Sequence, residues 1–283
     1  MYYSYPFVEE MMPLWYIFIF IFGLCVGSFL NVCIWRMPRG ESIVFTPSHC
    51  PNCNHKIKWY ENIPVLSWLL LQGRCSKCKT PISLRYLAIE ILSGVLILVD
   101  WWRVVEWHQP LSLFLLYLLA TILFIVTFFV DLKYKIIPNR LTYSVIIIGL
   151  LLALFFPQTM GINTSYEAFI NSVLGLTVAG GALAVVLMIG KLILKKDVLG
   201  WGDVKFIAAV GACFGFYPAV WFFCILTGSI LGTITGLIII CFGRGQWSTA
   251  LPFGTFLSIA GYLWILYGIE ITTYYFNCIG FAF

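Results

Sequence analysis

Long apolar runs dominate this chain of 283 residues and restrict what it can fold into. Hydrophobic residues make up 61% of the sequence and charged residues 10%, whereas soluble domains carry about 25% charged residues. A helix needs roughly 20 apolar residues to cross a bilayer, and in lipid it satisfies its own backbone hydrogen bonds. We therefore expect an all-α, polytopic membrane protein with about eight transmembrane helices. The expected spans are residues 14–34, 86–102, 111–130, 141–156, 169–194, 204–216, 219–242 and 251–274. The sixth is short and contains Gly211 and Gly215, so we expect it to be tilted, or re-entrant with the seventh.

The basic residues lie on one side of the expected membrane. Sixteen of the 17 Lys and Arg residues fall in or beside the loops after the first, third, fifth and seventh spans, and only Arg103 lies opposite. Cytoplasmic loops carry an excess of Lys and Arg, so we expect the N-terminus outside. The net charge of +5 follows from this asymmetry and gives no reason to expect nucleic-acid binding. The first thirteen residues contain Glu9 and Glu10 but no Lys or Arg, so we expect no cleaved signal peptide.

One long polar stretch, residues 37–85, interrupts the apolar pattern. It divides the chain into a first transmembrane helix (1–36), a cytoplasmic insert (37–85) and a transmembrane core (86–283). The insert contains two Cys-x-x-Cys pairs, separated by 21 residues: Cys50, Cys53, Cys75 and Cys78. Each such turn directs two thiolates toward one tetrahedral ion, and four thiolates favour zinc. We expect a structural zinc site that supplies much of the folding energy of this small insert.

Disulfides and a redox pair are the alternatives for these four cysteines. Disulfides are rare in the reducing cytoplasm, and a redox motif does not need two matching pairs. His49 and His55 are close enough in sequence to substitute as ligands, but we expect them to lie at the surface or behind the metal ligands. We expect the six other cysteines to be small core residues.

Two aspartates stand at the cytoplasmic ends of expected spans. Asp131 ends the third, and Asp203 opens the sixth as part of Gly200-Trp201-Gly202-Asp203. Acids at membrane depth are costly and mark candidate functional sites, and glycines beside an acid permit unusual backbone angles and close approach of another segment. We interpret Asp100 and Asp197 as ordinary charges at the water interface.

Two converging carboxyl groups can share one proton. One then activates water as a base while the other polarises a peptide carbonyl as an acid, which is aspartyl protease chemistry. Helix ends suggest a division of roles: negative charge is favoured where Asp203 opens a helix and disfavoured where Asp131 closes one. We hypothesise that Asp203 is the ionised base and Asp131 the protonated acid. No Ser–His or Cys–His pair competes.

These motifs together resemble the bacterial type IV prepilin peptidases, the leader peptidase/N-methyltransferases of the GxGD aspartyl protease type. The resemblance covers nearly the whole chain. The stretches that carry it are GSFLNVCIWRMPRG (27–40), PSHCPNC (47–53), ENIPVLSWLLLQGRCSKC (61–78), SLRYLAIE (83–90), DLKYKIIPN (131–139), GWGDVKF (200–206) and LPFGTFL (251–257).

The resemblance implies an enzyme of the bacterial inner membrane with a defined substrate. Members cut a basic leader from type IV prepilins and pseudopilins at the cytoplasmic face, and then methylate the new N-terminal residue with S-adenosylmethionine. The family's catalytic aspartates correspond to Asp131 and Asp203, and its cysteines to the four named above. Two positions depart from many relatives: Trp201 is larger than the usual residue, and Asn139 replaces an Asp but can still cap a helix start.

The methyltransferase half of this function is less visible in the sequence. There is no Rossmann-type glycine fingerprint for S-adenosylmethionine. The resemblance points to the insert and its flanks, where Glu61, Arg85 and Glu90 are our candidates for cofactor-binding residues. Ordinary packing or interface charge is the alternative for each.

Three other classes of protein are alternatives to a prepilin peptidase. A proton-coupled transporter would place its acids near the bilayer midplane, often within internal repeats, and neither feature is found. A zinc-stabilised scaffold would tolerate replacement of both aspartates by Asn. A signal peptide peptidase would have Tyr before its first acid and a late Pro-Ala-Leu string, where this chain has Val130 and Pro252-Phe253-Gly254.

Overall fold

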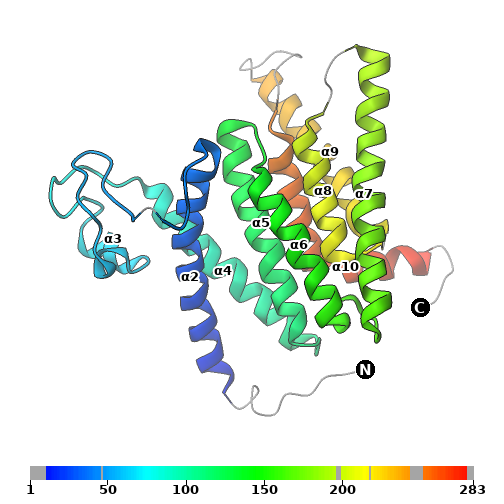
Figure 1. Cartoon of the computed structure of the whole chain (residues 1–283), viewed down its shortest axis with the longest axis horizontal. Helices are drawn as coiled ribbons and strands as arrows, with labels where there is room; N and C mark the ends of the chain where they lie inside the picture. The colour runs from blue at the N-terminus through cyan, green and yellow to red at the C-terminus, as the bar shows by residue number, and fades with distance from the viewer. Residues whose placement is uncertain (1–10, 46, 196–198, 217, 243–250, 279–283) are drawn as a thin grey trace. The chain divides into compact units, whose positions relative to one another are not determined.

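The computed structural model describes the chain as two compact helical units (Figure 1). The described residues are 11–45, 47–195, 199–216, 218–242 and 251–278. Unit 1 comprises Met1–Gln109 and unit 2 comprises Pro110–Phe283. Within the described residues the regular elements are helices, and the only β pairing consists of two isolated bridges in the insert, His49 with Lys56 and Arg74 with Pro81.

Unit 1 is an antiparallel helix pair with the polar insert between its members. Helix α2 (Met12–Arg36) packs against α4 (Leu84–Glu106). A Cβ at Gly23 would lie 2.8 Å from Cα of Gly94, and a Cβ at Gly27 would lie 2.7 Å from Cα of Glu90. Small residues let membrane helices approach closely. The insert contains only short helices, η1 (Met37–Arg39), η2 (Trp59–Asn62) and α3 (Leu66–Leu70).

Unit 2 is a bundle in which α8 is the most enclosed helix. Its elements are α5 (Ser112–Tyr134), α6 (Asn139–Phe155), η3 (Pro157–Met160), α7 (Ser165–Leu194), α8 (Trp201–Phe214), α9 (Pro218–Cys241) and α10 (Phe253–Cys278). Helix α8 packs against α6 and α7, while α10 packs against α5 and α9. The backbones of α7 and α8 touch, because a Cβ at Gly175 would collide with the carbonyl of Gly211 and a Cβ at Gly211 with that of Gly175.

The expected all-helical fold is confirmed, and each of the eight expected segments coincides with one helix. In the part of the chain that the structure describes, four helical stretches are long and apolar enough to cross a membrane: Met12–Arg39, Ser112–Tyr134, Ser165–Ile193 and Val220–Cys241. Two shorter apolar helices are Asn139–Phe155 and Phe253–Gly268. Helix α8 has 14 residues and is about 21 Å long, which is less than a hydrocarbon core of about 30 Å. The count of eight spans stays a prediction.

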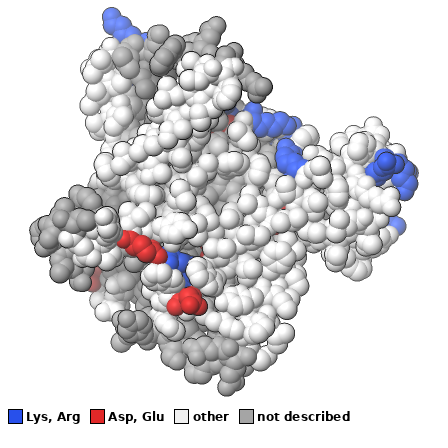
Figure 2. Space-filling view, turned by 180° about the vertical axis from the view of Figure 1, so that it is seen from behind, with Lys and Arg blue, Asp and Glu red and all other residues white. Residues whose placement is uncertain are grey.

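The surface also fits a membrane environment. Large apolar side chains are exposed along α2, among them Leu14, Ile17 and Phe18. Figure 2 shows a face on which charged side chains are sparse and most of the surface is uncharged. Apolar surface of this extent marks a membrane or partner contact rather than a water-facing surface.

Two sequence expectations about burial are wrong. Asp100 is not an interface charge but is fully buried, because α4 continues to Glu106 and Asp100 lies on its inner side. Cys25 and Cys241 are exposed rather than in the core. The expectations for Glu9, Glu10 and Asp197, and the basic residues Lys196 and Arg244, lie outside the described residues.

The contact between α7 and α8 leads to a stability prediction. Gly175→Ala forces the two backbones apart, and overpacking of this kind costs about 1–3 kcal/mol. We expect a lower unfolding temperature in detergent. The matched control is Gly181→Ala on the same helix, where a Cβ meets nothing within 4 Å and Ala is the better helix former. Equal unfolding temperatures for the two variants would contradict the close contact.

Candidate active site and metal centre

Asp131 lies in the last turn of α5, and its side chain reaches the first turn of α10. Its Oδ2 accepts hydrogen bonds from the backbone N–H of Thr255 at 2.9 Å and from the Thr255 hydroxyl at 3.4 Å. The backbone N–H of Gly254 also donates to this carboxyl group. Asp131 is only 5% exposed. The first turn of α10 therefore solvates a buried carboxyl group that the sequence places 124 residues away.

Asp203 is the third residue of α8 and reaches back over the start of its own helix. Its Oδ2 accepts a hydrogen bond from the backbone N–H of Gly200 at 3.1 Å. The side chain is 8% exposed, and its charge interacts with that of Asp131. The structure therefore brings the two predicted acids together within unit 2.

Both acids face the first turn of a helix, which changes one sequence argument. The proposed division of roles assumed that Asp131 experiences only the C-terminal end of α5. Its carboxyl group also accepts hydrogen bonds from the start of α10, where negative charge is favoured. The contrast between the two helix ends is therefore absent, and the assignment of the proton stays a prediction without that support.

Ile137 joins the two segments that carry the acids. A Cβ at Gly202 would lie 3.2 Å from Cβ of Ile137, and a Cβ at Gly254 would lie 2.8 Å from its Cδ1 and 3.1 Å from Oδ2 of Asp131. Gly200 has φ −88° and Gly202 is helical, so the expectation of unusual backbone angles at these glycines is wrong. The absence of a side chain at these glycines instead lets neighbouring groups approach closely, as we also expected.

A polar contact outside the acids ties the same two segments together. Nζ of Lys205, two residues after Asp203, donates a hydrogen bond to Oδ1 of Asn139 at 2.9 Å. The expectation that Asn139 caps a helix start is wrong, because Pro138 occupies the N-cap of α6 and no side-chain cap bond is formed. Asn139 instead uses its side-chain oxygen to contact α8.

Thr255 is the residue of this site that sequence reasoning missed. It lies within LPFGTFL, one of the stretches that carry the family resemblance. Nothing in that string indicates a hydrogen bond to Asp131, since Thr in an apolar helix more often bonds to its own backbone. Only the pairing of α5 with α10 reveals the contact.

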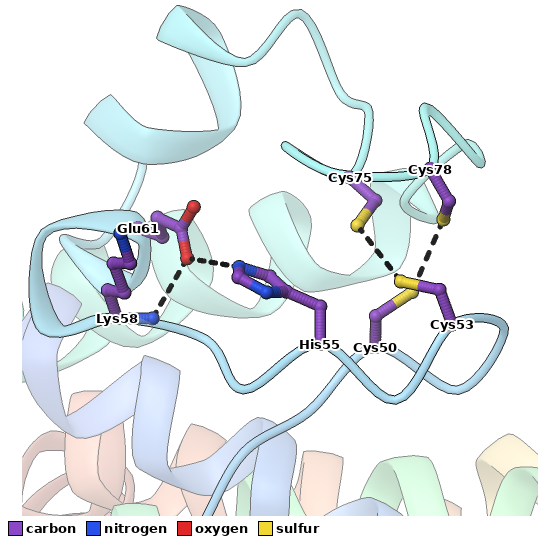
Figure 3. Close-up of polar contacts among 7 residues, drawn as sticks. All are labelled: Cys50, Cys53, His55, Lys58, Glu61, Cys75 and Cys78. Atoms are coloured by element: carbon purple, nitrogen blue, oxygen red, sulfur yellow. Dashed lines mark hydrogen bonds and ion pairs between the residues drawn. The ribbon is translucent and has the colours of Figure 1, made fainter.

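The four predicted metal ligands meet in the insert. Their Sγ atoms all lie within 4.8 Å of one another, with Cys50 3.7 Å from Cys78 and Cys53 3.9 Å from Cys75 (Figure 3). This spacing suits four thiolates around one tetrahedral ion. The residues therefore fit a structural zinc ion.

The two cysteine turns repeat one backbone pattern. The N–H of Cys50 donates to the carbonyl of His55, and the N–H of Cys75 donates to that of Thr80, each at 2.9 Å. Asn54 and Lys79, which directly follow the second cysteine of each pair, both have positive φ, 55° and 60°. We call these two turns the knuckles, residues 50–55 and 75–80. Each knuckle presents its two sulfurs in the same way.

Hydrogen bonds lower the pKa of both cysteine thiols in the second knuckle. The hydroxyl and backbone N–H of Thr80, followed by the amide of Asn52, lower the pKa of the Cys78 thiol to about 5. The backbone N–H groups of Cys78 and Lys77 lower the pKa of Cys75. The thiolate, not the thiol, is the metal ligand, so these contacts favour binding.

Glu61 links the two knuckles. Its Oε2 accepts hydrogen bonds from the backbone N–H of Lys58 at 2.9 Å and from Nε2 of His55 at 3.2 Å (Figure 3). The hydroxyl of Ser76, inside the second knuckle, also donates to this carboxyl group. The Lys58 N–H, with Ser76 and His55, lowers the pKa of Glu61. His55 thus lies behind the metal ligands, as expected.

Glu90 is buried in α4 and holds the insert in place. Its Oε2 accepts a hydrogen bond from the backbone N–H of Val65 at 2.8 Å, and the Ser28 hydroxyl also donates to it. Val65 has φ 62°, a conformation that β-branched residues rarely adopt. Arg85 is half-buried, and its Nε has no hydrogen-bond partner within the described residues.

A cavity of about 430 Å³ lies between α2 and the insert. Its wall includes Phe29, Val32 and Pro64 together with the polar residues Ser28, Arg36 and Asn62. Ligand pockets typically measure about 300–1,000 Å³ and combine apolar walls with a few polar groups. The wall residue Ser28 donates to Glu90, but Glu90, Glu61 and Arg85 are not themselves part of the wall. A nucleoside-sized cofactor such as S-adenosylmethionine is of the size that this volume holds.

Fold and site together define a helical membrane protein with a paired-carboxyl site and a separate four-cysteine centre. Residues 21–104 match the family described as the bacterial peptidase A24 N-terminal domain, and residues 117–237 match the type IV leader peptidase family. The first match spans the cysteine insert, and the second spans both aspartates.

Curated relatives match over nearly the whole chain. A prepilin leader peptidase/N-methyltransferase of Dichelobacter nodosus is 34% identical over 92% of this chain and 94% of its own length. Those of Stutzerimonas stutzeri and Legionella pneumophila are 33% and 34% identical, over 90% and 92% of this chain and 91% and 94% of their own lengths. No solved structure matches. The chain therefore belongs to the prepilin leader peptidase/N-methyltransferases of the type IV leader peptidase family.

The knuckles lead to a prediction about metal binding. We expect the purified protein to contain equimolar zinc by plasma mass spectrometry, and Cys78→Ser to lose it, because removing one thiolate leaves an incomplete tetrahedral site. The control is Cys241→Ser, an exposed cysteine outside the cluster. Alkylation without reductant tests the alternative: an intramolecular disulfide between any of the four would contradict the metal site.

Proposed function

We propose that this enzyme cleaves the basic leader of type IV prepilins and pseudopilins at the cytoplasmic membrane face and then N-methylates the new terminal residue with S-adenosylmethionine. The observation that carries the peptidase part is the convergence of Asp131 and Asp203. Both are buried, both accept backbone hydrogen bonds, and their segments meet at Ile137. The names of the relatives supply the substrate class.

Hydrolysis requires one proton to be shared by the two carboxyl groups. The ionised carboxylate accepts a proton from water while the oxygen of that water attacks the peptide carbonyl carbon. The protonated carboxyl group donates its proton to the carbonyl oxygen. Collapse of the tetrahedral intermediate breaks the C–N bond. The leaving amine takes the proton that the base received from water, and one hydroxyl of the intermediate returns its proton to the second carboxyl group, which restores the shared-proton state. Close like charges favour such sharing, because both groups cannot readily ionise together.

The proposed orientation brings this chemistry to the substrate. With the N-terminus outside, the insert and both aspartates lie at the cytoplasmic face, where basic residues are enriched. A precursor with a basic cytoplasmic leader and an apolar helix in the bilayer places its scissile bond at that same face. Gly200 and Gly202 contribute by allowing close approach of Ile137 and of the Asp203 carboxylate.

We place methyl transfer in unit 1. When bound, S-adenosylmethionine supplies an electrophilic methyl group. The cavity between α2 and the insert would hold it, with Ser28 and the buried Arg36 in its wall and with Glu90 acting through its hydrogen bond from Ser28. Glu61 and Arg85 remain candidates that act through the insert, since Glu61 holds the knuckles together. The zinc ion is structural in this proposal.

The peptidase proposal is tested by co-expressing a prepilin with wild type, Asp131→Asn or Asp203→Asn and measuring the mass of the product. Wild type should yield a shortened, methylated chain. Each Asn variant should reduce cleavage by at least ~100-fold, because Asn cannot transfer a proton. Cleavage by both variants would instead favour a scaffold or a transporter.

The methyltransferase proposal is tested with Glu90→Gln, which keeps an acceptor for the Val65 N–H but removes the charge. We expect methylation and equilibrium binding of S-adenosylmethionine to fall ~10- to 100-fold, the value of one charged hydrogen bond, while cleavage is retained. Glu106→Gln, exposed on the same helix, is the control. Unchanged methylation in Glu61→Ala, Arg85→Ala and Glu90→Gln would contradict all three candidates.

A further inference from the structure

The insert exposes an apolar surface that no described residue of unit 1 covers. Within residues 57–70, Trp59 is 81% exposed, Leu70 83% and Leu66 56%. The full set of large exposed apolar residues in this segment is Ile57, Trp59, Tyr60, Ile63, Leu66, Leu69 and Leu70. We call this set the apolar patch. An exposed apolar patch of this size typically marks a surface that contacts a protein or a membrane.

Helix α3 shows that the patch is one face of an ordered element. Trp68 turns inward, where its ring lies against Gly73 and its Nε1 donates a hydrogen bond to the carbonyl of Ile82 at 3.4 Å. Leu66, Leu69 and Leu70 point outward from the same five residues. The inward face holds the insert together, so the outward leucines are free to contact something else.

Basic side chains accompany the patch. The insert contains seven Lys and Arg residues and two Glu residues. Nζ of Lys58 lies 5.6 Å from the centre of the Tyr60 ring, and Lys56, Arg74, Lys77 and Lys79 are exposed. Of the two acids, Glu61 directs its carboxyl group at the knuckles. Exposed aromatic and aliphatic groups beside positive charge are typical of segments that lie in a membrane interface.

The position of α3 within unit 1 favours the bilayer as the occupant. The insert is joined at both ends to α2 and α4, which carry the first and second expected spans. Figure 1 shows α3 beside α2 rather than beyond the end of that helix. A segment tethered beside a membrane-spanning helix lies within reach of the bilayer surface, and the cytoplasmic leaflet is anionic.

We propose that the apolar patch inserts into the interface of the anionic cytoplasmic leaflet, with the neighbouring Lys and Arg side chains on the headgroups. The insert is then a membrane-bound platform, not a domain that hangs in the cytoplasm. This inference rests on the proposed cytoplasmic orientation of the insert, but not on the peptidase or methyltransferase assignments, because it otherwise uses only the exposure, charge and tethering of residues 37–85.

Hydrogen exchange of the full-length protein in nanodiscs tests the proposal. Peptides covering residues 57–70 should exchange several-fold more slowly in discs with equal parts phosphatidylglycerol and phosphatidylcholine than in pure phosphatidylcholine. The double variant Leu66→Ser/Leu70→Ser should lose that difference. The matched control Val44→Ser/Phe45→Ser changes two side chains of the insert that lie outside the patch and are at least as exposed as the two leucines, and it should keep the difference.

Three results would overturn the proposal. Protection that is the same in both lipids and in detergent means that the patch packs against protein, either the rest of the chain or a second copy. Equal, fast exchange in every medium means that the patch stays in water. Loss of protection in both double variants means that the signal reports the stability of the insert rather than lipid contact.

Discussion

The burial of two carboxyl groups beside each other constrains the rest of unit 2. Such a pair is tolerated only where hydrogen-bond donors replace water, and here backbone N–H groups at the starts of α8 and α10 provide them. Two helices must therefore begin at the same place, next to the end of a third. The glycines on either side keep side chains out of the space that the carboxyl groups and Ile137 occupy.

Unit 1 is built on a different principle. Its insert has little apolar core beyond Trp68, and the two knuckles are linked by the hydrogen bonds of Glu61 and by the convergence of four cysteines. Polar groups hold the insert from inside, which leaves its large apolar residues facing outward. Glu90 then connects the insert to α4 through the strained backbone of Val65. Metal site, cavity and apolar patch are thus parts of one small structure.

Local patterns predicted much of this protein, and long-range contacts account for what they missed. Hydropathy located the helices, and spacing located the cysteines, because both signals reside in neighbouring residues. The partner of Asp131 could not be read from sequence, since Thr255 meets it only through the pairing of α5 with α10. Asp100 was misplaced because hydropathy measures how apolar a run is, and does not tell which side of a helix faces inward. Asn139 was misread for a related reason: its partner is Lys205, on another helix.

The direct backbone contact of α7 with α8 has a consequence for motion. With no side chains between Gly175 and Gly211, nothing at that crossing can change rotamer to let one helix slide past the other. We therefore expect the two helices, and Asp203 with them, to move together. Separating α8 from α7 would break that crossing, so we expect displacement of the other helices to open the way to the carboxyl pair.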